Sequence, residues 1–155
     1  MKIWVDADAC PNVVKDIIYK AVLRLKVHAY FVANSFLKIP MSEFIHFIQV
    51  EKKFDGADTY IIDNLDFYDL VITADIPLAD HAVKKGCIAI NPRGELYTEN
   101  NISEKLSMRN YMQVLREGRI IQGGAGGFSD KDKQLFAAAF DRYTTLILKK
   151  ESKKI

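Results

Sequence analysis

The sequence has few cysteines and few histidines. Only two cysteines, Cys10 and Cys87, and three histidines occur among the 155 residues. No pair of them has the spacing of a disulfide scaffold or of a structural zinc site. The sequence therefore argues against a secreted disulfide-rich domain and against a zinc domain. A reducing cytoplasm is the location that this cysteine content predicts.

The sequence also lacks a long apolar run and a strong excess of charge. Asp6 and Asp8 interrupt the first apolar run, so no signal peptide is expected. No stretch approaches the roughly 20 apolar residues that cross a bilayer. The 22 basic and 20 acidic residues give a formal net charge of +2, which leaves nucleic-acid binding open without demanding it. We expect no membrane partner, and the sequence leaves the oligomeric state open, a homodimer included.

What the sequence does contain is an alternation of short apolar strands and helical patterns. Strands are predicted over 2–5, 28–33, 45–50, 70–74 and 87–90, and helices over 11–25, 56–65, 77–85, 103–117 and from Ser129 onward. This alternation predicts a mainly parallel sheet covered on both faces, which is a three-layer α/β/α sandwich with C-terminal helices. We expect one domain over 1–148 and a basic, disordered tail over 149–155.

Aspartates stand where the predicted strands end. Asp6 and Asp8 follow the first strand, Asp75 ends the fourth, Asp80 comes one helical turn later, and Asp58 lies early in the preceding helix. Ligands of open parallel sheets bind at the carboxyl ends of the strands. If strands one and four are neighbours, these five acids converge there. A hard divalent cation relieves their repulsion, so the pattern predicts a Mg²⁺ or Mn²⁺ site suited to phosphoryl chemistry.

Each aspartate also has an ordinary structural explanation. Aspartate is common at strand ends because it caps helices and forms turns, and Asp8 fits the position of a cap for the first helix. Asp6 and Asp75 are harder to explain by capping alone, since each ends a buried strand. Three further aspartates are expected at the surface or in turns: Asp63, Asp66 and Asp69.

Several other side chains are candidates for the same edge of the sheet. Arg93, just after the fifth strand, suits a phosphate or a structural carboxylate. Arg109 and Arg116 are seven residues apart, hence on one helix face, which is either a phosphate-facing stripe or a solvated surface. Asn34 ends the second strand and either contacts the site or forms a turn. Cys10 is expected to be a small buried residue rather than a nucleophile.

Six segments in the same order carry a family resemblance: VDADACP at 5–11, VAN at 32–34, GAD at 56–58, DLVITADIPLAD at 69–80, NPRGELYT at 91–98 and RNYMQVLREG at 109–118. Together they resemble the YaiI/YqxD family, a bacterial family placed in the wider PIN-like group of nuclease folds. The resemblance runs from Met1 to about Tyr143. It departs from the family at 123–128, where GGAGGF stands in place of Gly-Pro followed by Phe.

The resemblance implies a PIN-like sandwich and a nuclease that uses Mg²⁺ or Mn²⁺ to cleave phosphodiesters, usually of RNA. By position, the acidic ring of such nucleases corresponds to Asp6, Asp58, Asp75 and Asp80. Asp6 and Asp75 would ligate the metal, while the other two complete the ring or orient water. Asp8 is an additional acid beside the ring. Thr73 matches the small hydroxyl residue often found near this site.

Two other functions compete with the nuclease hypothesis. A haloacid-dehalogenase-type phosphatase also begins with a strand that ends in Asp-x-Asp, which would make Asp6 the nucleophile and Asp8 the general acid. No downstream lysine and acidic pair of that type is evident in this sequence. A non-catalytic module that binds nucleic acid or protein is the other alternative, and the near-neutral charge permits it.

Overall fold

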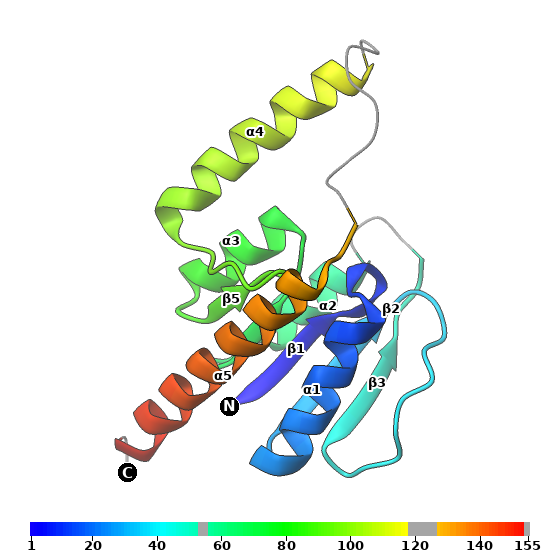
Figure 1. Cartoon of the computed structure of the whole chain (residues 1–155), viewed down its shortest axis with the longest axis vertical. Coiled ribbons are helices and arrows are strands. Elements are labelled where there is room, and N and C mark those ends of the chain that lie inside the picture. Colours follow the sequence, from blue (N-terminus) through cyan, green and yellow to red (C-terminus); the bar gives the residue numbers. More distant parts are fainter. Residues whose placement is uncertain (53–55, 118–126, 154–155) are drawn as a thin grey trace.

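The computed structural model describes the backbone of residues 1–52, 56–117 and 127–153, and the side chains of these residues except 109–117 (Figure 1). A five-stranded sheet in the order β3-β2-β1-β4-β5 forms its centre, and every pair of neighbouring strands is parallel. Its strands are β1 (Lys2–Asp6), β2 (His28–Ala33), β3 (Ile45–Gln49), β4 (Leu70–Ile72) and β5 (Ile88–Ile90). The predicted parallel sheet is confirmed, and β1 and β4 are neighbours.

Helices cover both faces of this sheet, as the α/β sandwich prediction requires. They are α1 (Asn12–Leu25), α2 (Gly56–Asn64), α3 (Ile76–Lys84), α4 (Glu99–Glu117) and α5 (Asp130–Lys153), with a short 3-10 turn η1 (Ala7–Ala9) after β1. One apolar core lies between the sheet and α1 and α5, and a second lies between the sheet and α2 and α3. In Figure 1, α4 packs beside α3 and then extends beyond the sandwich.

The alternation of side chains along β1 shows how one strand serves both cores. Ile3 and Val5 face α1 and α5, whereas Trp4 faces α2 and α3. All three are buried, with at most 3% of their surface exposed. Successive side chains of a strand point to opposite faces, so a strand covered on both sides is continuously apolar.

The connection between β2 and β3 differs from the other crossovers. Residues 34–44, all of which the structure describes, contain no helix. On the α1 side, Leu37 and Ile39 of this connection pack against the core in place of a helix. On the other side, His46 and Ile48 of β3 remain partly exposed. The sheet is therefore covered less completely at its β3 edge than at its centre.

Two helix boundaries differ from the predictions for a local reason. α4 begins at Glu99 rather than at Ser103, because Thr98 and Asn101 cap it reciprocally: the Asn101 N–H donates to Thr98 Oγ1 at 3.1 Å, and the Thr98 N–H donates to Asn101 Oδ1 at 2.8 Å. At the other end of the chain, α5 continues through Lys153, so residues 149–153 lie in a helix rather than in a disordered tail. The amino group of Met1 forms an ion pair with Glu151 in its last turns.

The predicted start of α5 is confirmed. Ser129 Oγ accepts the Asp132 N–H at 3.2 Å, and Asp132 Oδ2 accepts the Ser129 N–H at 2.9 Å. This pair of bonds satisfies donors that the first helical turn leaves open. The glycine-rich connection predicted at 123–127 lies outside the described residues, apart from Gly127.

Asp69 was expected at the surface or in a turn, and the expectation of an exposed side chain was wrong. Asp69 is 2% exposed and precedes β4. Its carboxylate accepts the Trp4 indole N–H at 3.0 Å and the backbone N–H groups of Lys2 and Asp66, each at 2.9 Å. A buried carboxylate is tolerated when several donors satisfy it, and here the donors come from β1 and from the turn before β4.

Within the described part of the chain, no helix is both long enough and apolar enough to cross a membrane.

Candidate functional site

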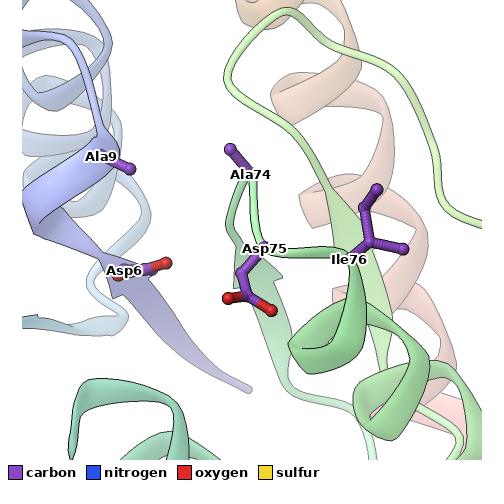
Figure 2. A pocket seen from close by; sticks show the side chains of 5 residues that line it. All are labelled: Asp6, Ala9, Ala74, Asp75 and Ile76. Atoms are coloured by element: carbon purple, nitrogen blue, oxygen red, sulfur yellow. The ribbon is translucent and has the colours of Figure 1, made fainter. Parts of the chain in front are cut away.

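The carboxyl ends of β1 and β4 enclose a pocket that two of the predicted aspartates line. Asp6 is the last residue of β1, and Asp75, three residues after the end of β4, directly precedes α3. With Ala9, Ala74 and Ile76 they line a hollow of about 290 Å³. Figure 2 shows the two carboxylates on opposite sides of this hollow, with the Asp6 carboxylate directed toward Asp75. Small alanine side chains at the rim leave both carboxylates accessible.

Thr73 connects the two aspartates. Its hydroxyl donates to Asp6 Oδ2 at 2.9 Å and accepts the Asp75 N–H at 2.9 Å. Thr73 is only 1% exposed, so its hydroxyl is held between these two partners. The family resemblance led us to expect Thr73 near this site, and this geometry makes it a residue that orients the Asp6 carboxylate. A direct contact of Thr73 with substrate stays a prediction.

Tyr97 holds the backbone of Thr73 through a hydrogen bond. The sequence analysis did not identify Tyr97 as a site residue. The Tyr97 hydroxyl donates to the backbone carbonyl of Thr73 at 3.1 Å, in a buried position. Burial, together with the negative charges of Glu95 and Asp75, raises the pKa of Tyr97 to about 12. The hydroxyl therefore stays protonated and remains a donor. The only sequence signal was its place in the NPRGELYT segment, because 24 residues separate it from Thr73.

Asp75 combines two functions that the sequence left as alternatives. Its Oδ1 accepts the Leu78 N–H at 3.0 Å, so Asp75 is the N-cap of α3. The cap engages one oxygen of the carboxylate. Since a carboxylate has two oxygens with about four acceptor sites, capping and ligand binding by Asp75 are compatible.

The electrostatic environment of Asp6 favours a cation. Burial raises the pKa of Asp6 above its usual value, and the negative charges of Asp75 and Asp8 raise it further. The hydrogen bond from Thr73 opposes this rise. Carboxylates this close repel one another, and a cation held between them would relieve that repulsion. The pocket is thus negatively charged, and the hydrogen bond from Thr73 offsets only part of the repulsion between its carboxylates.

Asp8 does not cap the first helix, contrary to one of the alternatives. It is exposed, and its Oδ2 accepts the Asn34 N–H at 2.7 Å. The N-cap of α1 is instead Pro11, whose carbonyl accepts the Val14 and Lys15 N–H groups. The Asp8 side chain therefore ties η1 to the end of β2, while its charge still acts on Asp6.

Asn34 lies between Asp8 and the first turn of α2. Its Oδ1 is buried and accepts no hydrogen bond from the residues that the structure describes. A Cβ atom added to Gly56 would lie 3.7 Å from this oxygen and 2.6 Å from the Glu51 carbonyl oxygen. Glycine at 56 therefore allows the start of α2 to approach the end of β2. Asp58, in the first turn of α2, is half-buried near this junction.

Asp80 and Arg93 are engaged in ion pairs. Asp80 accepts a hydrogen bond from Lys84, one turn later in α3, at 2.9 Å. Arg93 Nη1 lies 3.1 Å from Oδ2 of Asp132, the carboxylate that caps α5. Of the two alternatives for Arg93, a structural carboxylate is the partner in this structure. Arg109 and Arg116 lie in α4, where only the backbone is described.

The predicted acidic ring is therefore brought together only in part. Asp6 and Asp75 share one pocket, and the charge of Asp8 reaches it. No group of three or more histidine, cysteine, aspartate or glutamate side chains that could hold a metal occurs within the described residues. Two carboxylates still suit Mg²⁺ or Mn²⁺, because such ions are commonly bound by one or two carboxylates with waters and substrate phosphate. Asp6 and Asp75 are the residues that would hold the ion.

The thiol of Cys10, beside the pocket, is buried and held as the neutral thiol. Burial raises the pKa of Cys10 to about 12, an effect that the Lys15 charge opposes and the Asp6 charge reinforces. Burial likewise raises the pKa of Cys87 to about 11. Both thiols are only 6% exposed, and thiols react as thiolates. The expectation that Cys10 is a small buried residue is confirmed.

We therefore expect neither thiol of the native protein to react with an aromatic disulfide reagent at pH 8. The same assay in denaturant should titrate two thiols per chain, since the chain contains two cysteines. The measurement is the absorbance of the aromatic thiolate that the reagent releases, followed over minutes. Rapid reaction of one thiol in the native protein that Cys10→Ser abolishes would contradict the assignment of Cys10 as a packing residue.

Comparison with known proteins places these features in a family. The family model described as "Uncharacterized BCR, YaiI/YqxD family" matches residues 4–146. A UPF0178 protein of Marinomonas sp. (strain MWYL1) is 51% identical over 142 residues, which cover 92% of this chain and 95% of that protein. A UPF0178 protein of Myxococcus xanthus (strain DK1622) is 49% identical over 153 residues, covering 99% of this chain and 100% of that protein. No solved structure matches.

Proposed function

This chain belongs to the YaiI/YqxD family, and on that premise we propose that it is a Mg²⁺- or Mn²⁺-dependent phosphodiesterase of the PIN-like nuclease type that acts on RNA. The observation that supports this proposal most directly is the pocket that Asp6 and Asp75 share at the carboxyl ends of β1 and β4. This is where open parallel sheets bind their ligands. The pocket is negatively charged and accessible, and the Thr73 hydroxyl fixes the orientation of the Asp6 carboxylate within it.

Each of the aspartates and Thr73 has a separate role in this proposal. Asp6 and Asp75 hold the cation, and Thr73 keeps the Asp6 carboxylate in one orientation. A bound divalent cation would stabilise charge on a phosphoryl oxygen and activate water. In this proposal Asp58 and Asp80 complete the acidic edge or orient water, and Asp8 adds negative charge.

Substrate contacts form a second part of the proposal. Within the described part of the chain, the buried Asn34 Oδ1 accepts no hydrogen bond, and a buried acceptor without a donor is costly. A hydroxyl or amino group of the substrate would satisfy it, and the ribose 2′-hydroxyl is such a donor in RNA. Arg109 and Arg116 are proposed to bind phosphates. A guanidinium has five N–H donors, so Arg93 is proposed to contact a phosphate while its Nη1 stays on Asp132.

The phosphatase alternative is less well supported than the nuclease. It requires Asp8 to give a proton to a leaving group beside Asp6. In the structure, the Asp8 carboxylate accepts the Asn34 N–H. This contact engages one oxygen of Asp8 with the end of β2, so only its second oxygen could carry the proton. The lysine and acidic pair of this phosphatase type is also not evident in the sequence.

Metal removal is the direct test of the proposed function. We expect the chain to cleave end-labelled single-stranded RNA in Mn²⁺, to lose this activity in excess EDTA, and to recover it when excess Mn²⁺ is restored. p-Nitrophenyl phosphate should be assayed in parallel. Hydrolysis of this compound without cleavage of RNA would instead support the phosphatase. Absence of both activities, with no Mn²⁺ binding by calorimetry at millimolar metal, would support a non-catalytic binding module.

A further inference from the structure

Two histidines meet at the end of the sheet opposite to the aspartate pocket. His28 begins β2, and His46 is the second residue of β3. In the register of the sheet, His28 lies beside Lys2 at the start of β1, whereas Asp6 at the other end of β1 lies beside Val32. His28 Nδ1 is 2.9 Å from His46 Nε2. The proposed phosphodiesterase activity assigns no role to this pair of histidines.

The two rings meet edge to edge, so that their nitrogens point toward each other. The ring centroids are 5.1 Å apart and the planes differ by 26°, although the two nitrogens are only 2.9 Å apart. Each nitrogen must therefore lie on the side of its ring that faces the other ring, close to the line between the centroids. Imidazole lone pairs lie in the ring plane. The pair thus directs two nitrogen ligands at one small volume.

Packing holds both rings in place. The His46 ring stacks on Tyr30 with centroids 4.7 Å apart and planes at 17°, and Tyr30 in turn stacks on Trp4 at 4.6 Å. The His28 ring packs against Phe44 at 5.2 Å. The parallel register sets Tyr30 opposite His46, which fixes where the second ring stands relative to β2. Ligands that the fold positions in advance lose less freedom when they bind.

The pair is also reachable from solvent. His28 is exposed and His46 is partly exposed, because the α2 side of β3 is not fully covered. Burial lowers the pKa of His46, and the neighbouring His28 lowers it further. The neutral ring, which is the form that binds metals, is therefore the prevailing form of His46 at neutral pH.

From this geometry we propose that His28 and His46 form a binding site for one borderline transition-metal ion: Zn²⁺, Ni²⁺ or Cu²⁺. Imidazole nitrogen suits these ions, whereas carboxylate oxygens suit Mg²⁺ and Mn²⁺. The two sites therefore select different metals.

Binding requires both rings to turn, because each nitrogen now points at the other one, whereas a tetrahedral ion would lie to one side of the line between them. The ion replaces the proton that the two nitrogens share, and this proton passes to solvent. Two nitrogens that bind one tetrahedral zinc ion lie about 3.3 Å apart, a few tenths of an ångström more than the separation in the structure. The described residues offer this pair no third histidine, cysteine, aspartate or glutamate ligand, so water completes the coordination.

Titration of the full chain with Ni²⁺ and with Zn²⁺ by calorimetry tests this site, in buffer free of Mg²⁺ and Mn²⁺. We expect one ion per chain, and at least a tenfold loss of affinity in His46→Gln and in His28→Gln. The matched control is His81→Gln, which removes the third histidine from an exposed position on α3 and should bind as the wild type does. With Cu²⁺ as the probe, electron paramagnetic resonance should show coupling to two nitrogens.

Three outcomes would overturn the proposal. They are unchanged affinity in both His28→Gln and His46→Gln, an equal loss in His81→Gln, and a loss of the same ion in Asp6→Asn, which would move it to the aspartate pocket. Since His28 is exposed, His28→Gln keeps the test informative even if His46→Gln folds poorly. The readout is metal binding, so its result is independent of whether the chain cleaves RNA.

Discussion

Asp6→Asn and Asp75→Asn are each expected to reduce Mn²⁺-dependent RNA cleavage by about 100-fold or more. Both carboxylates line the same pocket, and each substitution removes one negative ligand while nearly preserving side-chain volume. The measurement is the single-turnover rate of cleavage of a labelled RNA across a range of Mn²⁺ concentrations. A weakened metal site should also shift the half-saturating Mn²⁺ concentration upward.

The loss in Asp6→Asn should not come from unfolding. Burial and two nearby carboxylates raise the pKa of Asp6 above its usual 3.8 in the folded chain. The folded state therefore holds this proton more tightly than the unfolded state does, and stability falls as pH rises from 3.8 through the raised value. Asparagine carries no charge and still offers Thr73 an oxygen. In EDTA, the variant should be more stable than the wild type at pH 7, with the advantage disappearing toward pH 3.

Asp141→Asn is the matched control for these variants. Asp141 is an exposed aspartate of α5, and its substitution changes the net charge by the same amount without touching the pocket. It should cleave RNA at the wild-type rate. Metal-dependent cleavage that survives in both Asp6→Asn and Asp75→Asn would refute the assignment of the site.

Asp69→Ala is expected to lower the free energy of unfolding by about 3–5 kcal/mol. The substitution leaves three donors without their acceptor: the Trp4 indole N–H and the backbone N–H groups of Lys2 and Asp66. Trp4 is only 3% exposed, so water cannot readily replace the carboxylate there. Because Trp4 is the only tryptophan of the chain, its fluorescence during urea denaturation reports on this contact directly.

Asp66→Ala provides the comparison for Asp69→Ala. Asp66 is exposed, and its carboxylate pairs with Lys2 Nζ at 2.5 Å. Exposed ion pairs contribute little to stability, so the effect of Asp66→Ala should be much smaller than that of Asp69→Ala. Equal effects of the two substitutions would show that the buried hydrogen bonds of Asp69 do not carry the stability assigned to them.

The strands and most helices were predictable because their signals are local. Continuous apolar runs predicted β1 and β2 to within one residue, since strands buried on both faces leave no room for polar side chains. The same reasoning placed Asp6 and Asp75 at strand ends, and alternation of strands and helices implied a parallel sheet. One local prediction was wrong: α4 begins at Glu99 rather than at Ser103, because the sequence analysis did not recognise the cap that Thr98 and Asn101 form.

The pairing of side chains across the chain was decided by the tertiary structure. Thr73 and Asp6 are 67 residues apart, Asp8 and Asn34 are 26 apart, and His28 and His46 are 18 apart. No local pattern distinguishes Asp69, which is buried beneath Trp4, from the exposed Asp66 three residues earlier. By itself the sequence determined which residues form strands and helices and which acids end them, because those preferences act over a few neighbouring residues. Only strand order and register, set by packing of the whole sheet, decided which of those acids meet.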